Sequence, residues 1–303
     1  MARYAIGVDL GGTNLRAAAV DSSGKLIERL SGRTNLAAGR DAVVGDIVDS
    51  ILRLRTACGD GGLAGIGVAV PGIIEMRRGI IRESPNLPGF NDFPVRDEIE
   101  RRLQAPVHLE NDANAAALGE KWVGAGRDVD DLVLLTLGTG IGGGIICQGK
   151  ILHGSLGMAG ELGHIQVVPH GNPCACGGHG CLEKHASATA VSLMARLMGL
   201  GDNLTSEEVY QLAVQGNSAA HVVFATMGRA LGVALADLIN IFDFPLYLLS
   251  GGALAAWDFF APSMFEEVRR SSYVYRYSKP RIDKAELGKD AGLFGAACLP
   301  FMA

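Results

Sequence analysis

The feature that most constrains the fold is a glycine-rich hairpin that occurs twice in the chain. In the first copy, the strand-like segment Tyr4–Leu10 runs into Gly11-Gly12-Thr13 and then into a second strand-like segment, residues 15–20. In the second copy, residues 132–137 run into the sequence GTGIGGG at 138–144 and continue as a strand. The hairpins lie about 127 residues apart. We interpret them as an internal duplication, which predicts two related α/β lobes.

The remaining segments alternate between strand and helix patterns. We expect helices at about 41–57, from 112 onward, at 218–241 and at 291–298, and strands at 66–70, 107–109 and 246–249. Thr205 and Glu208 have the spacing of a capping box at the start of a further helix. With 48% hydrophobic and 19% charged residues, the chain has the composition of an ordinary globular enzyme.

Charge and hydropathy argue against two classes of partner. The net charge is −5 and no basic run is present, so we expect no nucleic-acid partner. Long apolar stretches are interrupted well short of the ~20 residues that a membrane helix needs, so we expect no membrane partner. No signal peptide precedes the first strand, which predicts a cytoplasmic protein.

The glycine hairpins have the composition of phosphate-binding turns. Gly11 and Gly12 allow backbone N–H groups to approach an anion, and Thr13 adds a hydroxyl donor. Asp9, at the end of the preceding strand, is a candidate ligand for hydrated Mg²⁺. Neither hairpin has the G-x-x-x-x-G-K-[S/T] spacing of a P-loop. A plain turn with an aspartate is the alternative interpretation of the first copy alone.

The sequence Glu110-Asn111-Asp112 lies where an apolar strand meets an alanine-rich helix. Asn111 or Asp112 could be a simple helix N-cap. Asp112 could equally be a general base, kept ionised by the helix dipole, that accepts the proton of an attacking alcohol.

A cysteine cluster predicts a structural zinc site. His164 is followed by Cys174-x-Cys176-x₄-Cys181, which makes a closed Cys₃His ligand set without an open position. Three cysteines this close together indicate a metal site rather than disulfides in a reducing compartment. Two carboxylates, Glu161 and Glu183, flank the set and are suited to sugar hydroxyls. Four further histidines have no evident partner and are expected at the surface: His153, His170, His179 and His185.

Taken together, five motifs resemble the ROK family of bacterial sugar kinases and sugar-responsive repressors. They are DLGGT at 9–13, ENDAN at 110–114, LGTG at 137–140, GELGH at 160–164 and CACGGHGCLE at 174–183. The resemblance covers essentially the whole chain. It implies an actin-like ATPase (ribonuclease H-like) fold with two duplicated lobes around a cleft. We expect a small N-terminal lobe over residues 1–117, joined by a C-terminal helix at about 289–303, and a larger lobe over 118–288 that contains the zinc loop.

The resemblance also implies roles for individual residues. Asp112 matches the catalytic base. The sugar contacts are matched by Asn86, Asn111, Asp112, Glu161, His164 and Glu183. Nucleotide-side positions are matched by Gly11, Gly12, Thr13, Thr139, Gly140, Gly251 and Gly252, with Asp9 beside them. His164 would serve zinc with one ring nitrogen and sugar with the other.

The implied activity is ATP-dependent phosphorylation of the 6-hydroxyl of a hexose with Mg²⁺. The loop SPNLPGFNDFP at 84–94 is most similar to the family's ATP-dependent glucokinases, which favours glucose. N-acetylmannosamine or N-acetylglucosamine kinase, and a polyphosphate donor, are alternatives. A repressor is disfavoured because eight residues before Asp9 leave no room for a DNA-binding domain, and a non-catalytic sugar sensor would not need Asp112. The family implies a homodimer or homotetramer.

Overall fold

The computed structural model describes residues 3–59 and 61–302, and its elements group into two compact units. The first unit contains Met1–Asp130, Gly144–Gly160 and Glu286–Ala303, and the second contains Asp131–Gly143 and Glu161–Ala285. The outermost residues of the predicted domain ranges, 1, 2 and 303, lie outside the described residues.

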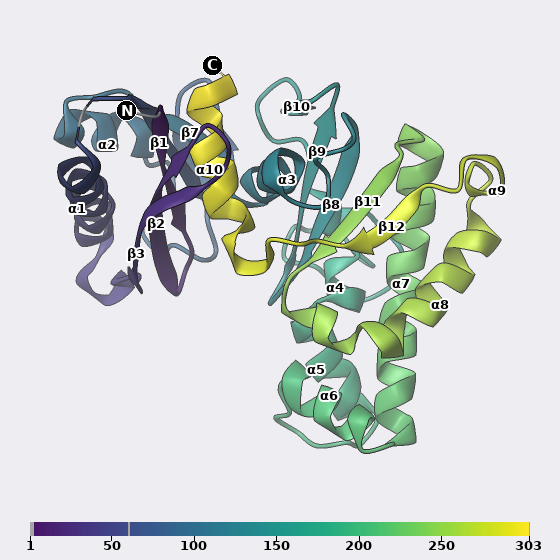
Figure 1. Ribbon diagram of the computed structural model, residues 1–303. Helices are drawn as coiled ribbons and strands as arrows, with labels where there is room; N and C mark the ends of the chain where they lie inside the picture. Colours follow the sequence, from purple (N-terminus) through teal and green to yellow (C-terminus); the bar gives the residue numbers. More distant parts are fainter. Residues whose placement is uncertain (1–2, 60, 303) are drawn as a thin grey trace. The chain divides into compact units, whose positions relative to one another are not determined.

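A five-stranded sheet of order β3-β2-β1-β4-β7 forms the centre of the first unit (Figure 1). Its strands are β1 (Tyr4–Leu10), β2 (Asn14–Asp21), β3 (Leu26–Arg33), β4 (Leu63–Val70) and β7 (His108–Asn111). The first three form an antiparallel meander, and β4 pairs in parallel with both β1 and β7. The small ladder of β5 (Ile73–Glu75) and β6 (Ile80–Glu83) lies apart from this sheet.

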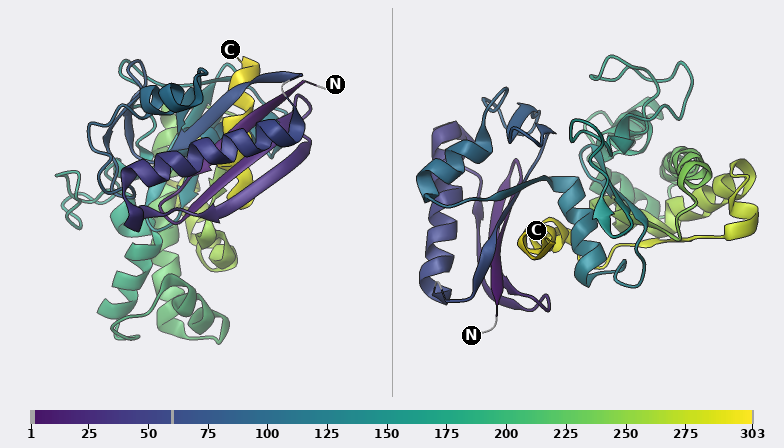
Figure 2. Two further views of the ribbon diagram at one scale, coloured as in Figure 1. Left: turned by 90° about the vertical axis from the view of Figure 1, so that its left-hand side faces the viewer. Right: turned by 90° about the horizontal axis from the view of Figure 1, so that it is seen from above.

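Helices cover both faces of this sheet, as Figure 2 shows from above. Alternate residues of the buried strands face α1 (Arg40–Cys58) and α2 (Val95–Leu103) in one continuous apolar core. The opposite face packs on α10 (Ala291–Met302), and this contact requires glycine. A side chain at Gly67 would collide with the Ala296 carbonyl of α10, and one at Gly7 would lie 2.6 Å from the Leu293 carbonyl. Small residues therefore let helix and sheet approach closely.

Helix α3 (Asp112–Val123) belongs to the first unit, whereas the predicted lobe boundary at residue 117 cuts through it. The reason is close packing on α10: a side chain at Gly295 would collide with the Ala115 carbonyl. The buried Glu120 carboxylate also accepts hydrogen bonds from the backbone N–H groups of Glu286 (3.1 Å) and Leu287 (2.7 Å). These contacts hold the chain that leads into α10 against α3.

The second sheet repeats the order of the first as β10-β9-β8-β11-β12. Its strands are β8 (Leu132–Leu137), β9 (Ile141–Cys147), β10 (Lys150–Ile151), β11 (Leu246–Ser250) and β12 (Arg281–Lys284). As in the first sheet, the fourth strand of the order pairs in parallel with the strands beside it, here β8 and β12. The shared strand order is what a duplicated chain should produce.

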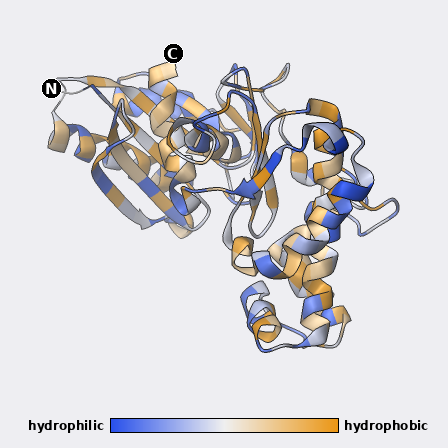
Figure 3. Ribbon diagram, turned by 45° about the vertical axis from the view of Figure 1, so that its right-hand side comes forward, coloured by the Kyte–Doolittle hydropathy of each residue, from blue (hydrophilic) through white to orange (hydrophobic). Residues whose placement is uncertain are grey.

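Strand β10 and most of β9 fall in the first unit, and apart from its strands the second unit is helical. Its helices are α4 (Glu183–Ala186), α5 (Ala188–Leu197), α6 (Ser206–Val214), α7 (Ser218–Phe242), α8 (Trp257–Ser271) and α9 (Tyr275–Ser278). The predicted capping box is confirmed at α6, where Thr205 and Glu208 bond reciprocally. Among the described residues, α7 alone is long and apolar enough to cross a membrane, but its most apolar window is 67% buried. Figure 3 shows hydrophobic residues along most of this helix, which is typical of a core helix.

Candidate active site and metal centre

The first glycine turn lies directly beside the predicted sugar-side loop. Gly11 and Gly12 join β1 to β2, and the Gly11 N–H donates to the Asn14 carbonyl at 2.8 Å. A β-carbon at Gly12 would lie 3.0 Å from the Asn86 carbonyl, so that position leaves little room for a side chain. The Thr34 hydroxyl donates to the Gly11 carbonyl at 2.6 Å and holds the turn from the other side. The first unit therefore brings a nucleotide-side turn and the candidate sugar contact Asn86 together.

Asp9 lies at the end of β1, 9% exposed, with Arg16 as its ion-pair partner at 3.2 Å. Burial raises the pKa of Asp9, the Arg16 guanidinium lowers it, and nearby Asp290 raises it further. A β-carbon at Gly292, in the first turn of α10, would lie 3.0 Å from an Asp9 carboxylate oxygen. The glycine thus leaves that oxygen uncovered on this side. Both carboxylates are paired with arginines, Asp9 with Arg16 and Asp290 with Arg29 at 2.6 Å, so a hydrated divalent cation at Asp9 would have to be accommodated beside these ion pairs.

The strand-to-helix turn at 110–112 contains the N-cap of α3 and the candidate base. Asn111 is the N-cap of α3: its Oδ1 accepts from the N–H groups of Ala113 (2.9 Å) and Asn114 (3.1 Å). Its Nδ2 donates to the Gly72 carbonyl at 3.1 Å. Asp112 is the first residue of the helix, where the helix dipole favours the ionised carboxylate. Asn111 is the N-cap, and Asp112 Oδ1 also accepts from the Ala113 N–H at 2.9 Å, so Asp112 shares in the capping.

The second glycine turn contacts a predicted sugar-side carboxylate within the second unit. Glu183 Oε2 accepts from the Ile141 N–H at 3.1 Å, and a side chain at Gly140 would collide with the same oxygen. The Thr139 carbonyl accepts the Thr189 hydroxyl at 2.8 Å. Glu161 lies within electrostatic range: partial desolvation raises its pKa, His164 lowers it and Glu183 raises it further.

Gly251 and Gly252 follow β11 and lie at the same end of the second sheet as this turn. Gly251 has a φ of +100°, and a side chain there would collide with the Leu137 carbonyl at the end of β8. A small cavity of about 20 Å³ lies beside Gly252, between the 3₁₀ turn Gly252–Ala256 and helices α5, α6 and α7. The four predicted nucleotide-side residues of the second unit are therefore neighbours.

The metal-ligand candidates come together as predicted. The ligand atoms of His164, Cys174, Cys176 and Cys181 all lie within 4.8 Å of one another. Cys174 Sγ is 3.6 Å from His164 Nδ1, and Cys176 Sγ is 3.6 Å from Cys181 Sγ. Tetrahedral zinc with Zn–S bonds of ~2.3 Å requires ligand atoms about 3.6–3.8 Å apart, so the donor set fits zinc. His164 directs Nδ1 at the cluster.

The expectation that His153 is an unpartnered surface residue is wrong. Its Nε2 lies 2.7 Å from Oε2 of the buried Glu110, and the side chain is 39% exposed. His185 is also half-buried, and burial lowers its pKa. The sequence offers no signal for the His153 contact because 43 residues separate the pair. Arg16, by contrast, was predictable, since an antiparallel hairpin around the glycine turn places it opposite Asp9.

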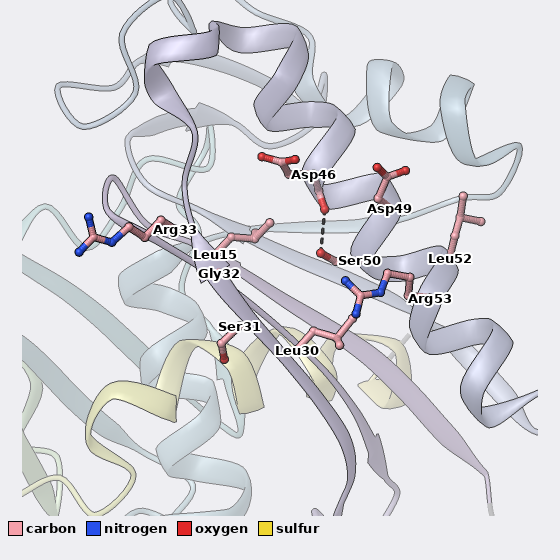
Figure 4. A pocket seen from close by; sticks show the side chains of 10 residues that line it. All are labelled: Leu15, Leu30, Ser31, Gly32, Arg33, Asp46, Asp49, Ser50, Leu52 and Arg53. Atoms are coloured by element: carbon pink, nitrogen blue, oxygen red, sulfur yellow. Dashed lines mark hydrogen bonds between the residues drawn. The ribbon is translucent and has the colours of Figure 1, made fainter.

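A larger cavity of about 490 Å³ lies in the first unit (Figure 4). Strands β2 and β3 and helix α1 line it, through Leu15, Leu30, Ser31, Gly32, Arg33, Asp46, Asp49, Ser50, Leu52 and Arg53. None of the predicted site residues is among them. The volume of a cavity therefore does not by itself identify the candidate active site.

The duplicated sheets and paired glycine turns define the chain as a protein of the actin-like ATPase class, which confirms the predicted fold. The sequence pattern of the ROK family matches residues 5–301. The chain belongs to the ROK family.

Three similar proteins show how far the likeness extends. A glucokinase of Thermotoga maritima is 38% identical over 97% of this chain and 96% of its own length. The crystal structure of a ROK hexokinase from Thermus thermophilus has a TM-score of 0.90 at 36% identity, covering 99% of this chain and 98% of that one. A ROK glucokinase from Streptomyces griseus, in complex with glucose and AMPPNP, has a TM-score of 0.80 at 33% identity, covering 99% and 100%.

Proposed function

We propose that the chain is a sugar kinase that transfers the γ-phosphoryl group of ATP to the 6-hydroxyl of a hexose, with glucose as the preferred acceptor. The observation that carries the proposal is the turn at Asn111 and Asp112, where Asn111 is the N-cap and a carboxylate occupies the first position of the helix, with its Oδ1 accepting from the Ala113 N–H at 2.9 Å. The relatives support the class of reaction: proteins of nearly the same length at 33–38% identity are glucokinases, one of them in complex with glucose and AMPPNP.

In this reaction Asp112 accepts the proton of the attacking hydroxyl as the oxygen reaches phosphorus. The N-terminal end of α3 keeps the carboxylate ionised and therefore able to accept that proton. Phosphoryl transfer otherwise depends on positioning and charge neutralisation. The turns at Gly11-Gly12 and Thr139-Gly140 supply backbone N–H groups for phosphate oxygens. Asp9 would hold Mg²⁺, which neutralises phosphate charge when bound.

The candidate sugar contacts are polar residues, named here for each unit separately. Asn86 and Asn111 are the candidates of the first unit, and Glu161, His164 and Glu183 those of the second. Zinc held by Cys174, Cys176, Cys181 and His164 Nδ1 would have a structural role, because four protein ligands close its coordination. His164 Nε2 is then the ring nitrogen left for a sugar hydroxyl.

Reduced cysteines and ATP both indicate the cytoplasm as the place of action. The ROK family further implies a homodimer or homotetramer, which sedimentation of the purified chain would test.

The experiment that tests the function is ATP-dependent ADP release with Mg²⁺ across glucose, mannose, fructose, N-acetylglucosamine and N-acetylmannosamine. We expect the highest kcat/KM with glucose. Preference for an N-acetyl sugar would overturn the choice of substrate but not the kinase activity. Turnover with polyphosphate in place of ATP would overturn the choice of donor. An absence of turnover with every sugar and both donors would contradict the assignment as an enzyme.

A further inference from the structure

Glu110 is the buried carboxylate next to the proposed catalytic turn. It is the penultimate residue of β7, and its side chain is 1% exposed. Oε1 accepts from the Asn111 N–H at 2.9 Å and from Asn114 Nδ2 at 3.1 Å. One oxygen therefore connects the turn backbone to the first turn of α3. A buried carboxylate is costly unless each oxygen has a hydrogen-bond partner.

His153 supplies the partner of the other oxygen. Its Nε2 lies 2.7 Å from Glu110 Oε2, which is a short contact typical of a charge-assisted hydrogen bond. Both remaining contacts of Glu110 come from neutral amides in its own turn. His153 is therefore the one described side chain that holds this carboxylate from a distant part of the chain.

The backbone around His153 is itself held in place. The preceding residue, Leu152, donates its N–H to the Ile145 carbonyl of β9 at 2.8 Å. The His153 carbonyl accepts from the Ala159 N–H at 3.1 Å and closes a short loop. Gly154 enters that loop at a φ of +69°, which favours glycine. The imidazole is thus presented to Glu110 by a fixed loop rather than by a mobile tail.

We propose that His153 is a positioning residue for phosphoryl transfer, acting through Glu110 on the turn that carries Asn111 and Asp112. The proposal rests on the proposed role of Asp112 as general base. His153 need not touch either substrate: its hydrogen bond fixes the side of Glu110 that faces away from the turn. Loss of that bond leaves Glu110 free to rotate and carry the turn with it. Displacements of about 1 Å at a reacting group can cost ~100-fold in rate.

The test compares variants that differ in one hydrogen-bond donor. His153→Ala removes the donor, His153→Gln keeps an N–H near the position of Nε2, and His153→Asn carries the same amide on too short a side chain. We expect kcat to fall ~10–100-fold in the alanine and asparagine variants, with a smaller change in KM for glucose, and to recover in the glutamine variant. The control is His108→Gln, a substitution of an exposed histidine on β7, the strand that contains Glu110.

A merely structural role is distinguished by combining His153→Asn with Asp112→Asn. If His153 acts through Asp112, the double variant should be no slower than Asp112→Asn alone, because the two effects are not additive. The proposal would be overturned if His153→Asn lowered kcat by the same factor with and without Asp112→Asn. It would also be overturned if kcat were unchanged in His153→Ala and His153→Asn. A fully active Asp112→Asn variant would instead overturn the proposed base, independently of the result at His153. If the alanine variant fails to fold, the asparagine and glutamine pair gives the same contrast.

Discussion

At the scale of single residues, three consecutive residues in the turn at the end of β7 have different roles. Glu110 is buried and anchors the turn, Asn111 caps the helix, and Asp112 begins it. The sequence left open whether residue 111 or residue 112 is the cap. The hydrogen bonds of Asn111 Oδ1 decide that question in favour of Asn111.

Replacing Asp112 by asparagine should therefore remove the base without removing the cap. We expect kcat to fall ~10²–10⁴-fold, the usual contribution of general-base catalysis. The Kd for glucose, measured by calorimetry, should change little, since the amide keeps the size of the side chain. Asp97→Asn, an exposed substitution in α2, is the matched control. A kcat equal to that of the unaltered chain would show that Asp112 is not the base.

The Glu110–His153 pair should make stability depend on pH. The hydrogen bond that His153 donates to Glu110 raises the pKa of His153, partial burial lowers it, and the Glu110 charge adds to the rise. The protonated ring is therefore favoured in the folded chain. That stabilisation is complete below the unfolded pKa of about 6.5 and is lost as pH rises through the higher folded value.

Urea unfolding of the unaltered chain and of His153→Gln measures this effect. The difference in unfolding free energy between them should be larger at pH 5.5 than at pH 9, because glutamine cannot take up a proton. Other histidines are common to both proteins and cancel. A difference that is constant across this range would argue against an ion pair at His153.

At the scale of elements, the loop from 161 to 183 has little hydrophobic packing of its own. Most of its residues are exposed or half-buried, and few belong to the hydrophobic core. Its backbone folds tightly around the cysteines: the Cys174 N–H donates to the Gly178 carbonyl at 2.9 Å. Gly180 has a φ of +71°, and any side chain there would collide with the Val168 carbonyl. With the proposed zinc bound, such a loop would gain its rigidity from ligation.

We expect one zinc ion per chain by elemental analysis, and a lower Tm after treatment with a strong chelator. Cys176→Ser should lower Tm by roughly 5 °C, which corresponds to a loss of ~1–3 kcal/mol at the ~2–4 °C per kcal/mol typical of large domains. It should also weaken glucose binding, since Glu161 and Glu183 flank the loop. Cys58→Ser, a half-buried thiol outside the loop, is the control. A folded and active protein without metal would contradict the zinc site.

At the scale of the whole molecule, a true substrate should stabilise the fold by mass action. At 100 times its Kd, a ligand that binds only the folded chain adds ~2.7 kcal/mol to the free energy of unfolding. We expect glucose to raise Tm accordingly in thermal unfolding. N-acetylmannosamine at the same concentration should raise it less. An equal rise with both sugars would remove the basis for preferring glucose.

Local patterns in the sequence were sufficient to predict much of the secondary structure, the two lobes and the candidate metal ligands. Hydrophobic periodicity marked the strands and the long helix α7, and the repeated glycine hairpin indicated two related α/β lobes, in agreement with the shared strand order of the two sheets. Cysteine spacing indicated the metal cluster, because its ligands lie within eighteen residues of the chain, from His164 to Cys181. Chemistry carried by neighbours in sequence can be recognised without a structure.

Contacts between distant segments were decided only by the tertiary structure. The predicted boundary at residue 117 did not take account of α3 packing on α10, because the small residues that permit this contact lie more than 150 residues apart in sequence. His153 has no local pattern, and only the fold brings it to Glu110. Packing selects such pairs by shape and by the need to satisfy a buried charge, and neither condition leaves a regular spacing in the sequence.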